Sequence, residues 1–404
     1  MRPWGLVALL AGTATASYLA RVNVSVAGAL MREELALDPA AMGRVFSAFL
    51  LGYALCQVPA GMLADRFGAR RVLALASLSW VVALAAMAFV PAAAALPLLL
   101  GFRLLLGVGE APTFPAAAQA ISRHIPPEAR GRANGLVVAA IGLGSAIAPP
   151  FVGAVMVRFG WRAAIAASAL PALAVGLGWL AVRRMPPELG PDDGRREAAP
   201  AGGAGRAPRP SPFRSRSFAL LTASYTLQGY VGYIFVFWFY LYLVDVRGFG
   251  LLRGALLSSL PWILSIVSIP AGGAVSDALV KRLGEARGRR VVPMAGLIGG
   301  SAFIAVGAHT ANAYVAAVCL ALATALVLSV EGPFWATMTE LAGPRSGAAG
   351  GVMNMGSNLG GLVSPALTPV LAAAIGWERA LHVAAALAVA GGLLWLGIAP
   401  PEEA

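Results

Sequence analysis

Charged residues are scarce in this 404-residue sequence. Only 12% of its residues are Asp, Glu, Lys or Arg, whereas 59% are hydrophobic. A soluble domain carries roughly 25% charged residues, so the chain has about half the charge that an aqueous surface needs. The shortage excludes an ordinary soluble protein and indicates a chain that lies mostly in a lipid bilayer.

Residues that build metal and catalytic sites are also rare. The two cysteines, Cys56 and Cys319, lie inside apolar segments, and the three histidines show no metal-ligand spacing. The sequence has no phosphate-binding loop of the Walker type and no recognisable catalytic triad. We therefore expect no metal, no cofactor and no enzymatic activity, and we expect the energy source to be an ion or solute gradient rather than ATP.

Apolar runs of about 20 residues, the length of a bilayer-spanning helix, recur along the chain. The first run also resembles a cleaved secretory signal peptide. Cleavage of this run would leave eleven spans and break the repeat described below. The sequence predicts an all-α membrane protein with twelve transmembrane helices. The expected spans are 4–30, 40–63, 72–90, 96–122, 133–156, 161–182, 217–243, 252–278, 291–308, 312–338, 348–373 and 378–398.

The basic residues predict the orientation of these spans. The net charge of +12 would suit a nucleic-acid binder, but the arginines lie in short loops between apolar runs and not on one soluble face. With both termini in the cytoplasm, 21 of the 30 lysines and arginines fall in cytoplasmic segments and seven fall on the opposite side. This excess predicts cytoplasmic termini and no nucleic-acid partner.

Two halves of the sequence repeat each other. Leu143-Gly144, Pro149 and Gly160-Trp161 return 216 residues later as Leu359-Gly360, Pro365 and Gly376-Trp377. The repeat predicts two pseudo-symmetric six-helix halves, residues 1–183 and 217–404. Between them, residues 184–216 are rich in Pro, Gly, Arg and Ala without apolar periodicity, which predicts a cytoplasmic linker.

The loop between the second and third spans carries a specific spacing of glycines, an acid and bases, from Gly61 to Arg71. Asp65 lies at a helix end, where it can pair with an arginine or with the N-terminus of a neighbouring helix. Such a contact can hold one conformation and release another. We therefore predict a conformational latch formed by Asp65, Arg66, Arg70 and, in a weaker copy of the loop, Asp277. The alternative is an ordinary loop that obeys the positive-inside rule.

This loop resembles the signature of the major facilitator superfamily, and the span pattern agrees over the whole chain. The first half further resembles the anion:cation symporter family, which includes bacterial hexuronate, galactonate, glucarate and phthalate permeases, sialin and the vesicular glutamate transporters. The stretches that carry this second resemblance are Arg21-Val22-Asn23, Phe49-Leu50-Leu51-Gly52-Tyr53, Gly107-Val108-Gly109-Glu110-Ala111-Pro112-Thr113-Phe114-Pro115-Ala116 and, in the second half, Asn354, Gly356, Asn358 and Gly360-Gly361. The resemblance implies secondary active transport of organic anions.

Three charged residues interrupt the apolar runs of the first half: Arg21, Arg103 and Glu110. An arginine near the bilayer centre costs about 2.5–3.5 kcal/mol on insertion scales, so it normally faces a wet cavity or a partner. We predict that Arg21 and Arg103 attract a substrate carboxylate and that Glu110 exchanges the coupled proton. The alternatives are that Arg21 extends to the outer interface and that Glu110 only neutralises one of the arginines.

In one respect the sequence departs from the family. Several proton-coupled bacterial members carry an acid immediately before the first arginine, where this chain has Ala20. Glu331, the repeat counterpart of Glu110, is the candidate second proton-coupling residue. The stoichiometry of coupling is therefore open.

Polar residues of the seventh and eleventh spans are candidates for the rest of the substrate site. Gln228 and Tyr233 could bind hydroxyl groups or stack on a ring, although lipid-facing packing would explain the aromatic residues of this span equally well. Asn354 and Asn358, one turn apart, either bind substrate or hydrogen-bond to another helix. The resemblance favours binding.

Together these observations predict a secondary active transporter of small organic anions, either sugar acids or aromatic carboxylates. Its partners would be the anion, protons and the lipid bilayer. We expect a monomer in the bacterial inner membrane that works by proton symport and alternating access. The rival hypotheses are a proton-driven exporter of drugs or metabolites, which would tolerate loss of Arg21, and a transporter-like sensor.

Overall fold

The computed structural model of the chain describes residues 1–187, 212–342 and 345–399, and every regular element in that part of the chain is helical. This confirms the prediction of an all-α protein. The first group of helices is α1 (Pro3–Glu34), α2 (Pro39–Phe67), α3 (Ala69–Ala88), α4 (Ala95–Glu110), α5 (Thr113–His124), α6 (Pro127–Ala167) and α7 (Ala169–Ala181). Most of the predicted linker 184–216 lies outside the described residues.

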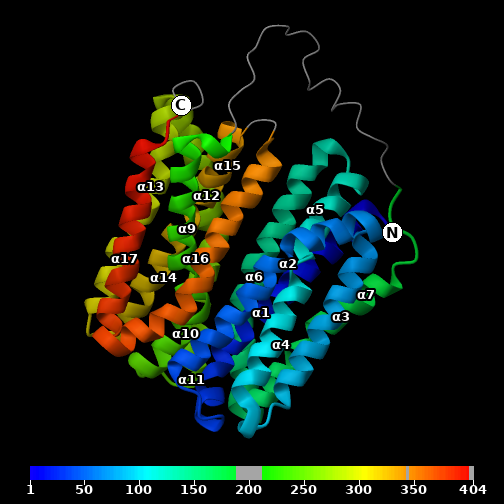
Figure 1. Cartoon of the computed structure of the whole chain (residues 1–404), viewed down its shortest axis with the longest axis vertical. Helices are drawn as coiled ribbons and strands as arrows, with labels where there is room; N and C mark the ends of the chain where they lie inside the picture. The colour runs from blue at the N-terminus through cyan, green and yellow to red at the C-terminus, as the bar shows by residue number, and fades with distance from the viewer. Residues whose placement is uncertain (188–211, 343–344, 400–404) are drawn as a thin grey trace.

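The second group follows the linker. It contains α9 (Arg216–Phe237), α10 (Phe239–Leu241), the π-helical turn η3 (Tyr242–Val246), α11 (Leu251–Leu257), α12 (Leu260–Leu283), α13 (Glu285–His309), α14 (Ala313–Ser329), α15 (Glu331–Ala342), α16 (Ser346–Ile375) and α17 (Trp377–Leu394). The two groups form two bundles side by side (Figure 1). Helix α1 begins and α17 ends at the same end of the molecule, which we call the near end; α1 ends at the far end.

Ten helical segments in the described residues are long and apolar enough to cross a bilayer, and the pair Arg216–Phe237 and Phe239–Val246, bent by 53°, would make an eleventh. One of the ten, Ala129–Ala181, is 53 residues long, whereas a single crossing needs only about 20. It is broken at Gly160, whose φ of 81° and ψ of 166° are not helical. A division there would match the spans expected at 133–156 and 161–182; the total of twelve stays a prediction.

The internal repeat has a physical cause in helix packing. A Cβ atom on Gly144 of α6 would lie 2.4 Å from the carbonyl oxygen of Thr15 in α1, and one on Gly360 of α16 would lie 2.1 Å from that of Thr226 in α9. In both halves the fifth expected span therefore touches the backbone of the first. Only a glycine permits this approach, which explains why the residue recurs after 216 positions.

The same interval separates the glycines that turn the chain between helices. Gly68 and Gly284 have φ of 81° and 80°, and Gly160 and Gly376 have φ of 81° and 84°. These angles are unfavourable for any residue with a Cβ. The repeat thus fixes where helices end as well as how they pack, and the two pseudo-symmetric halves follow from both.

Helix α4 offers a direct test of such packing. A Cβ on Gly107 would lie 2.0 Å from the carbonyl oxygen of Phe49 in α2, whereas one on Gly101 would meet nothing within 4 Å. Gly107→Ala should therefore destabilise the protein by about 1–3 kcal/mol through overpacking, seen as a lower midpoint of thermal unfolding in detergent. Gly101→Ala, on the same helix, should leave the midpoint unchanged or raise it. Equal midpoints for the two variants would contradict the close approach of α2 and α4.

The two bundles touch closely toward the far end. A Cβ on Gly43 of α2 would lie 2.2 Å from the carbonyl oxygen of Pro365 in α16. Ser25 of α1 donates a hydrogen bond of 2.8 Å to the carbonyl of Phe237 in α9. Arg32, near the end of α1, forms an ion pair with Asp245 of η3. Backbone contact, a hydrogen bond and an ion pair therefore all join the halves on this side.

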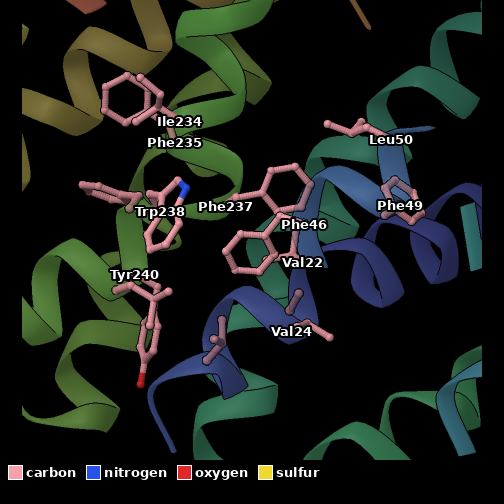
Figure 2. Packing of buried hydrophobic residues seen from close by; sticks show 14 of the residues in the cluster. Val22, Val24, Phe46, Phe49, Leu50, Ile234, Phe235, Phe237, Trp238 and Tyr240 are labelled. Carbon is pink, nitrogen blue, oxygen red and sulfur yellow. The ribbon is translucent and has the colours of Figure 1, made fainter. Parts of the chain in front are cut away.

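Aromatic rings fill the space beside these contacts. Phe46 of α2 stacks on Phe237 with ring centroids 4.9 Å apart, and it meets Trp238 edge-on at 5.4 Å. Figure 2 shows Phe237 pointing from the second half toward Phe46 in the first. All three side chains are buried. They lie where α9 breaks before α10, so the break places two rings at the boundary between the halves.

Candidate functional site

Arg21 and Glu110 form a buried ion pair between α1 and α4. The guanidinium Nη2 lies 3.1 Å from Glu110 Oε2, and the side chains are 2% and 0% exposed. Ser17, one turn earlier on α1, donates a hydrogen bond of 2.7 Å to the same carboxylate oxygen. Because breaking a buried pair leaves an uncompensated charge, the pair is held tightly unless a proton or another anion replaces a partner.

An aromatic cage surrounds the guanidinium of Arg21. The ring centroids of Tyr18, Phe49 and Tyr53 lie 4.4, 4.9 and 4.7 Å from its Cζ atom. The negative faces of aromatic rings attract a cation and exclude water without supplying a counter-charge. Arg21 therefore does not extend to an exposed position, which disfavours the alternative that it reaches an interface.

Arg103 lies beside this pair without an acid of its own. It is fully buried, its Cζ lies 4.8 Å from the Phe49 ring, and its Nη2 donates a long hydrogen bond of 3.4 Å to the carbonyl of Arg21. Its Nε and Nη1 have no hydrogen-bond partner among the described residues. Glu110 thus pairs with Arg21 and not with Arg103, and the cluster of two arginines and one glutamate has one positive charge in excess.

Glu331, at the start of α15, holds the corresponding place in the second half. Tyr225 donates a hydrogen bond of 2.7 Å to its Oε2, and Gln228 donates one of 3.0 Å to its Oε1. No lysine, arginine or histidine of the described chain lies within ion-pair distance of it. Both partners are neutral, unlike those of Glu110. Gln228, predicted to bind substrate, lies against this acid.

A looser group of polar side chains joins the two halves. The amide nitrogens of Asn354 and Asn358 in α16 lie 3.4 and 3.5 Å from Gln57 Oε1 in α2. Tyr233 of α9 donates to Asn358 Oδ1 at 3.5 Å, and its hydroxyl lies close enough to Arg21 for an electrostatic interaction. The structure therefore brings Tyr233, Asn354 and Asn358 of the second half together with Gln57 of the first; their role in binding substrate stays a prediction.

Gln57 is not among the site residues predicted from the sequence. A signal was present, because Gln57 is the only amide or charged side chain between Arg44 and Asp65. A polar group inside an apolar span normally has a partner or a function. The flanking residues of Gln57 match no motif, so its relation to Asn354 required the three-dimensional structure.

The residues of the predicted latch contact their own halves. Asp65 accepts a hydrogen bond of 3.2 Å from Gln119 of α5, and Arg70 donates to the carbonyl of Trp179 at 3.3 Å. Arg66 stacks on the neighbouring Phe67 ring. In the second half, Arg289 bridges Asp277 and Glu340 with ion pairs of 2.6 Å each. No contact of these residues among those described crosses between the halves, so the latch stays a prediction.

Comparison with known proteins gives consistent results. The profile of the Major Facilitator Superfamily matches residues 10–365. The chain is 34% identical over 401 residues to a probable sulfoacetate transporter of Cupriavidus necator, covering 95% of this chain and 91% of that one. It is 27% identical over 382 residues to a hexuronate transporter of Bacillus subtilis, covering 93% and 90%.

A solved structure shows the same fold. The structure of a bacterial homologue of the human lysosomal transporter Spinster superposes with a TM-score of 0.82 over 98% of this chain and 96% of that one, at 18% sequence identity. At this identity the likeness concerns the arrangement of helices alone. The expected helical architecture is thus found in an experimental structure.

Proposed function

The chain belongs to the Major Facilitator Superfamily, and from that premise we propose that it carries small organic anions across a bacterial inner membrane by proton symport. It is a multi-pass membrane transporter and not an enzyme. The observation that carries the proposal is the excess of one positive charge among Arg21, Arg103 and Glu110. A buried positive charge needs an anion, and a substrate carboxylate or sulfonate would supply it.

Glu110 is the proposed switch for this charge. While ionised, it occupies the Nη2 edge of Arg21 and competes with the substrate for the guanidinium. Protonation removes its negative charge, so Arg21 becomes available for the anion. Proton and anion would therefore bind together, which is the requirement for symport.

Glu331 is the proposed second proton carrier. Its partners Tyr225 and Gln228 are neutral, and no cation of the described residues lies within ion-pair distance to hold it in the ionised form. Tyr233 lies within electrostatic range of both Glu331 and Glu110. Tyr233 would therefore respond to a change of charge at either acid.

Movement of the halves completes the proposal. Substrate bound between Arg21, Tyr233, Asn354 and Asn358 would contact both halves, which would rock about it in alternating access. Asp65, Arg66, Arg70 and Asp277 would latch one arrangement from the cytoplasmic side, where the linker and both termini are proposed to lie. The protein would act as a monomer.

Uptake into proteoliposomes tests the function. Purified protein should accumulate labelled D-galacturonate or sulfoacetate, the acid classes of its relatives, above the level of empty liposomes when the outside is acidic. A protonophore should abolish the accumulation. Uptake of neither acid, or accumulation that the protonophore leaves intact, would contradict the proposed function.

A further inference from the structure

We propose that Gln57, together with Asn354 and Asn358, forms a subsite that binds the hydroxyl groups of the substrate, while Arg21 binds its acid group. This inference rests on the proposed function and deepens it, because it assigns a chemical class to the part of the substrate away from the acid. Polyhydroxylated acids should bind through this subsite, and acids without hydroxyl groups should not need it.

The contacts between Gln57 and the two asparagines are long. The two contacts within this amide group measure 3.4 and 3.5 Å, beyond the 2.7–3.2 Å of ordinary N–H···O hydrogen bonds. By contrast, Glu110 and Glu331 are held by contacts of 2.7 Å. The acids are therefore firmly bound by protein groups, whereas the amides are loosely paired and lose little when a substrate group inserts between them.

The amide group has hydrogen-bond donors and acceptors that no described residue uses. Gln57 uses its Oε1 as the acceptor for two amides, which leaves both N–H groups of its Nε2 without a partner among the described residues. Asn354 Oδ1 likewise has no donor in that part of the chain. Unused donors beside an unused acceptor match a hydroxyl group, which donates one hydrogen bond and accepts two. A second acid group would find donors here but no positive charge.

The position of Gln57 along α2 also suits a substrate subsite. Gln57 is 14 residues beyond Gly43 on α2, about 21 Å toward the near end at 1.5 Å per residue. It thus lies well away from the far-end contact with Pro365, and its contacts with α16 cross between the halves. A substrate anchored at Arg21 and reaching these amides would bridge both halves. Half-buried Gln57 and Asn354 are also more accessible than Asn358, which is 4% exposed.

Uptake kinetics of Gln57→Met in proteoliposomes test the subsite, because methionine keeps the length of the side chain and removes its polar atoms. For D-galacturonate, which carries hydroxyl groups, KM should rise about tenfold, the loss expected for one or two neutral hydrogen bonds. The maximal rate should stay within about twofold. For sulfoacetate, which has none, both constants should stay within about twofold. If Gln57→Met folds poorly, Asn354→Leu serves as the second variant. It should likewise raise KM for D-galacturonate and leave the constants for sulfoacetate within about twofold.

Val58→Ala is the matched control, because Val58 is the next residue on α2 and its side chain is 74% exposed; it should leave both acids unaffected. Equal losses for both acids in Gln57→Met would overturn the subsite and assign Gln57 to a contact between the halves only. Wild-type uptake of sulfoacetate but not of D-galacturonate would also overturn it. Uptake of neither acid by the wild type would instead refute the proposed function itself.

Discussion

Arg21→Ala is expected to reduce uptake of an organic anion at least 100-fold. The variant removes the guanidinium that is caged by Tyr18, Phe49 and Tyr53. It also leaves Glu110 as a buried acid without its cation. Charge-assisted hydrogen bonds contribute about 1.5–3 kcal/mol each, and about 2.8 kcal/mol corresponds to a factor of 100 in affinity. Initial uptake rates in proteoliposomes measure the loss.

Two controls separate charge from structure. Arg158→Ala removes an arginine that is exposed in the fold, and it should transport like the wild type. Arg21→Lys keeps the charge but lacks the planar guanidinium that suits both the rings and a carboxylate, so it should fall between the wild type and Arg21→Ala. Full transport by Arg21→Ala would contradict the anion site and favour the exporter hypothesis.

Glu110→Gln should separate binding from coupling. The amide keeps the shape of the side chain and can still accept a hydrogen bond from Ser17 or Arg21, but it cannot titrate. Concentrative uptake driven by an inward proton gradient should fall to the background, whereas exchange of internal for external substrate should persist. Because the competing carboxylate is gone, the apparent affinity for the anion should rise, by about tenfold if one charge-assisted hydrogen bond is released.

The comparison of two assays on one preparation makes this result decisive. Counterflow reports that the folded protein still binds and moves substrate, so a loss restricted to gradient-driven uptake identifies the coupling step. Glu34→Gln is a suitable control, because Glu34 also pairs with an arginine, Arg162, but lies outside the proposed site and the proposed latch. Undiminished accumulation by Glu110→Gln would refute its role in proton transfer.

Much of the fold could be predicted from the sequence, because the bilayer imposes simple rules. Long apolar runs must be helical, and the recurring glycines at 144 and 360 mark backbone contacts that tolerate no side chain. The burial of Arg21, Arg103 and Glu110 also followed from their apolar neighbours. These are local properties or exact repeats, and a single sequence displays both.

The partners of the polar residues could not be predicted in this way. Glu110 pairs with Arg21, 89 positions away, although Arg103 lies on its own helix. Gln57 meets Asn354 across 297 residues, and Gln228 hydrogen-bonds to Glu331. Such pairs depend on how each helix is rotated about its own axis and on which helices of the two halves face each other. Neither is encoded in the spacing along one span.

The contact between Gly43 and Pro365 has a consequence for energy conservation. Where two helices touch backbone to backbone, beside the stacked rings of Phe46 and Phe237, the packed contact would hinder a file of water molecules. Under the proposed proton coupling, a carrier must not dissipate the gradient while empty, and this contact would separate the acids from the solution at the far end. Replacing Gly43 by a larger residue would keep α2 and α16 apart at this contact. Liposomes that contain such a variant should then lose their pH difference even without substrate.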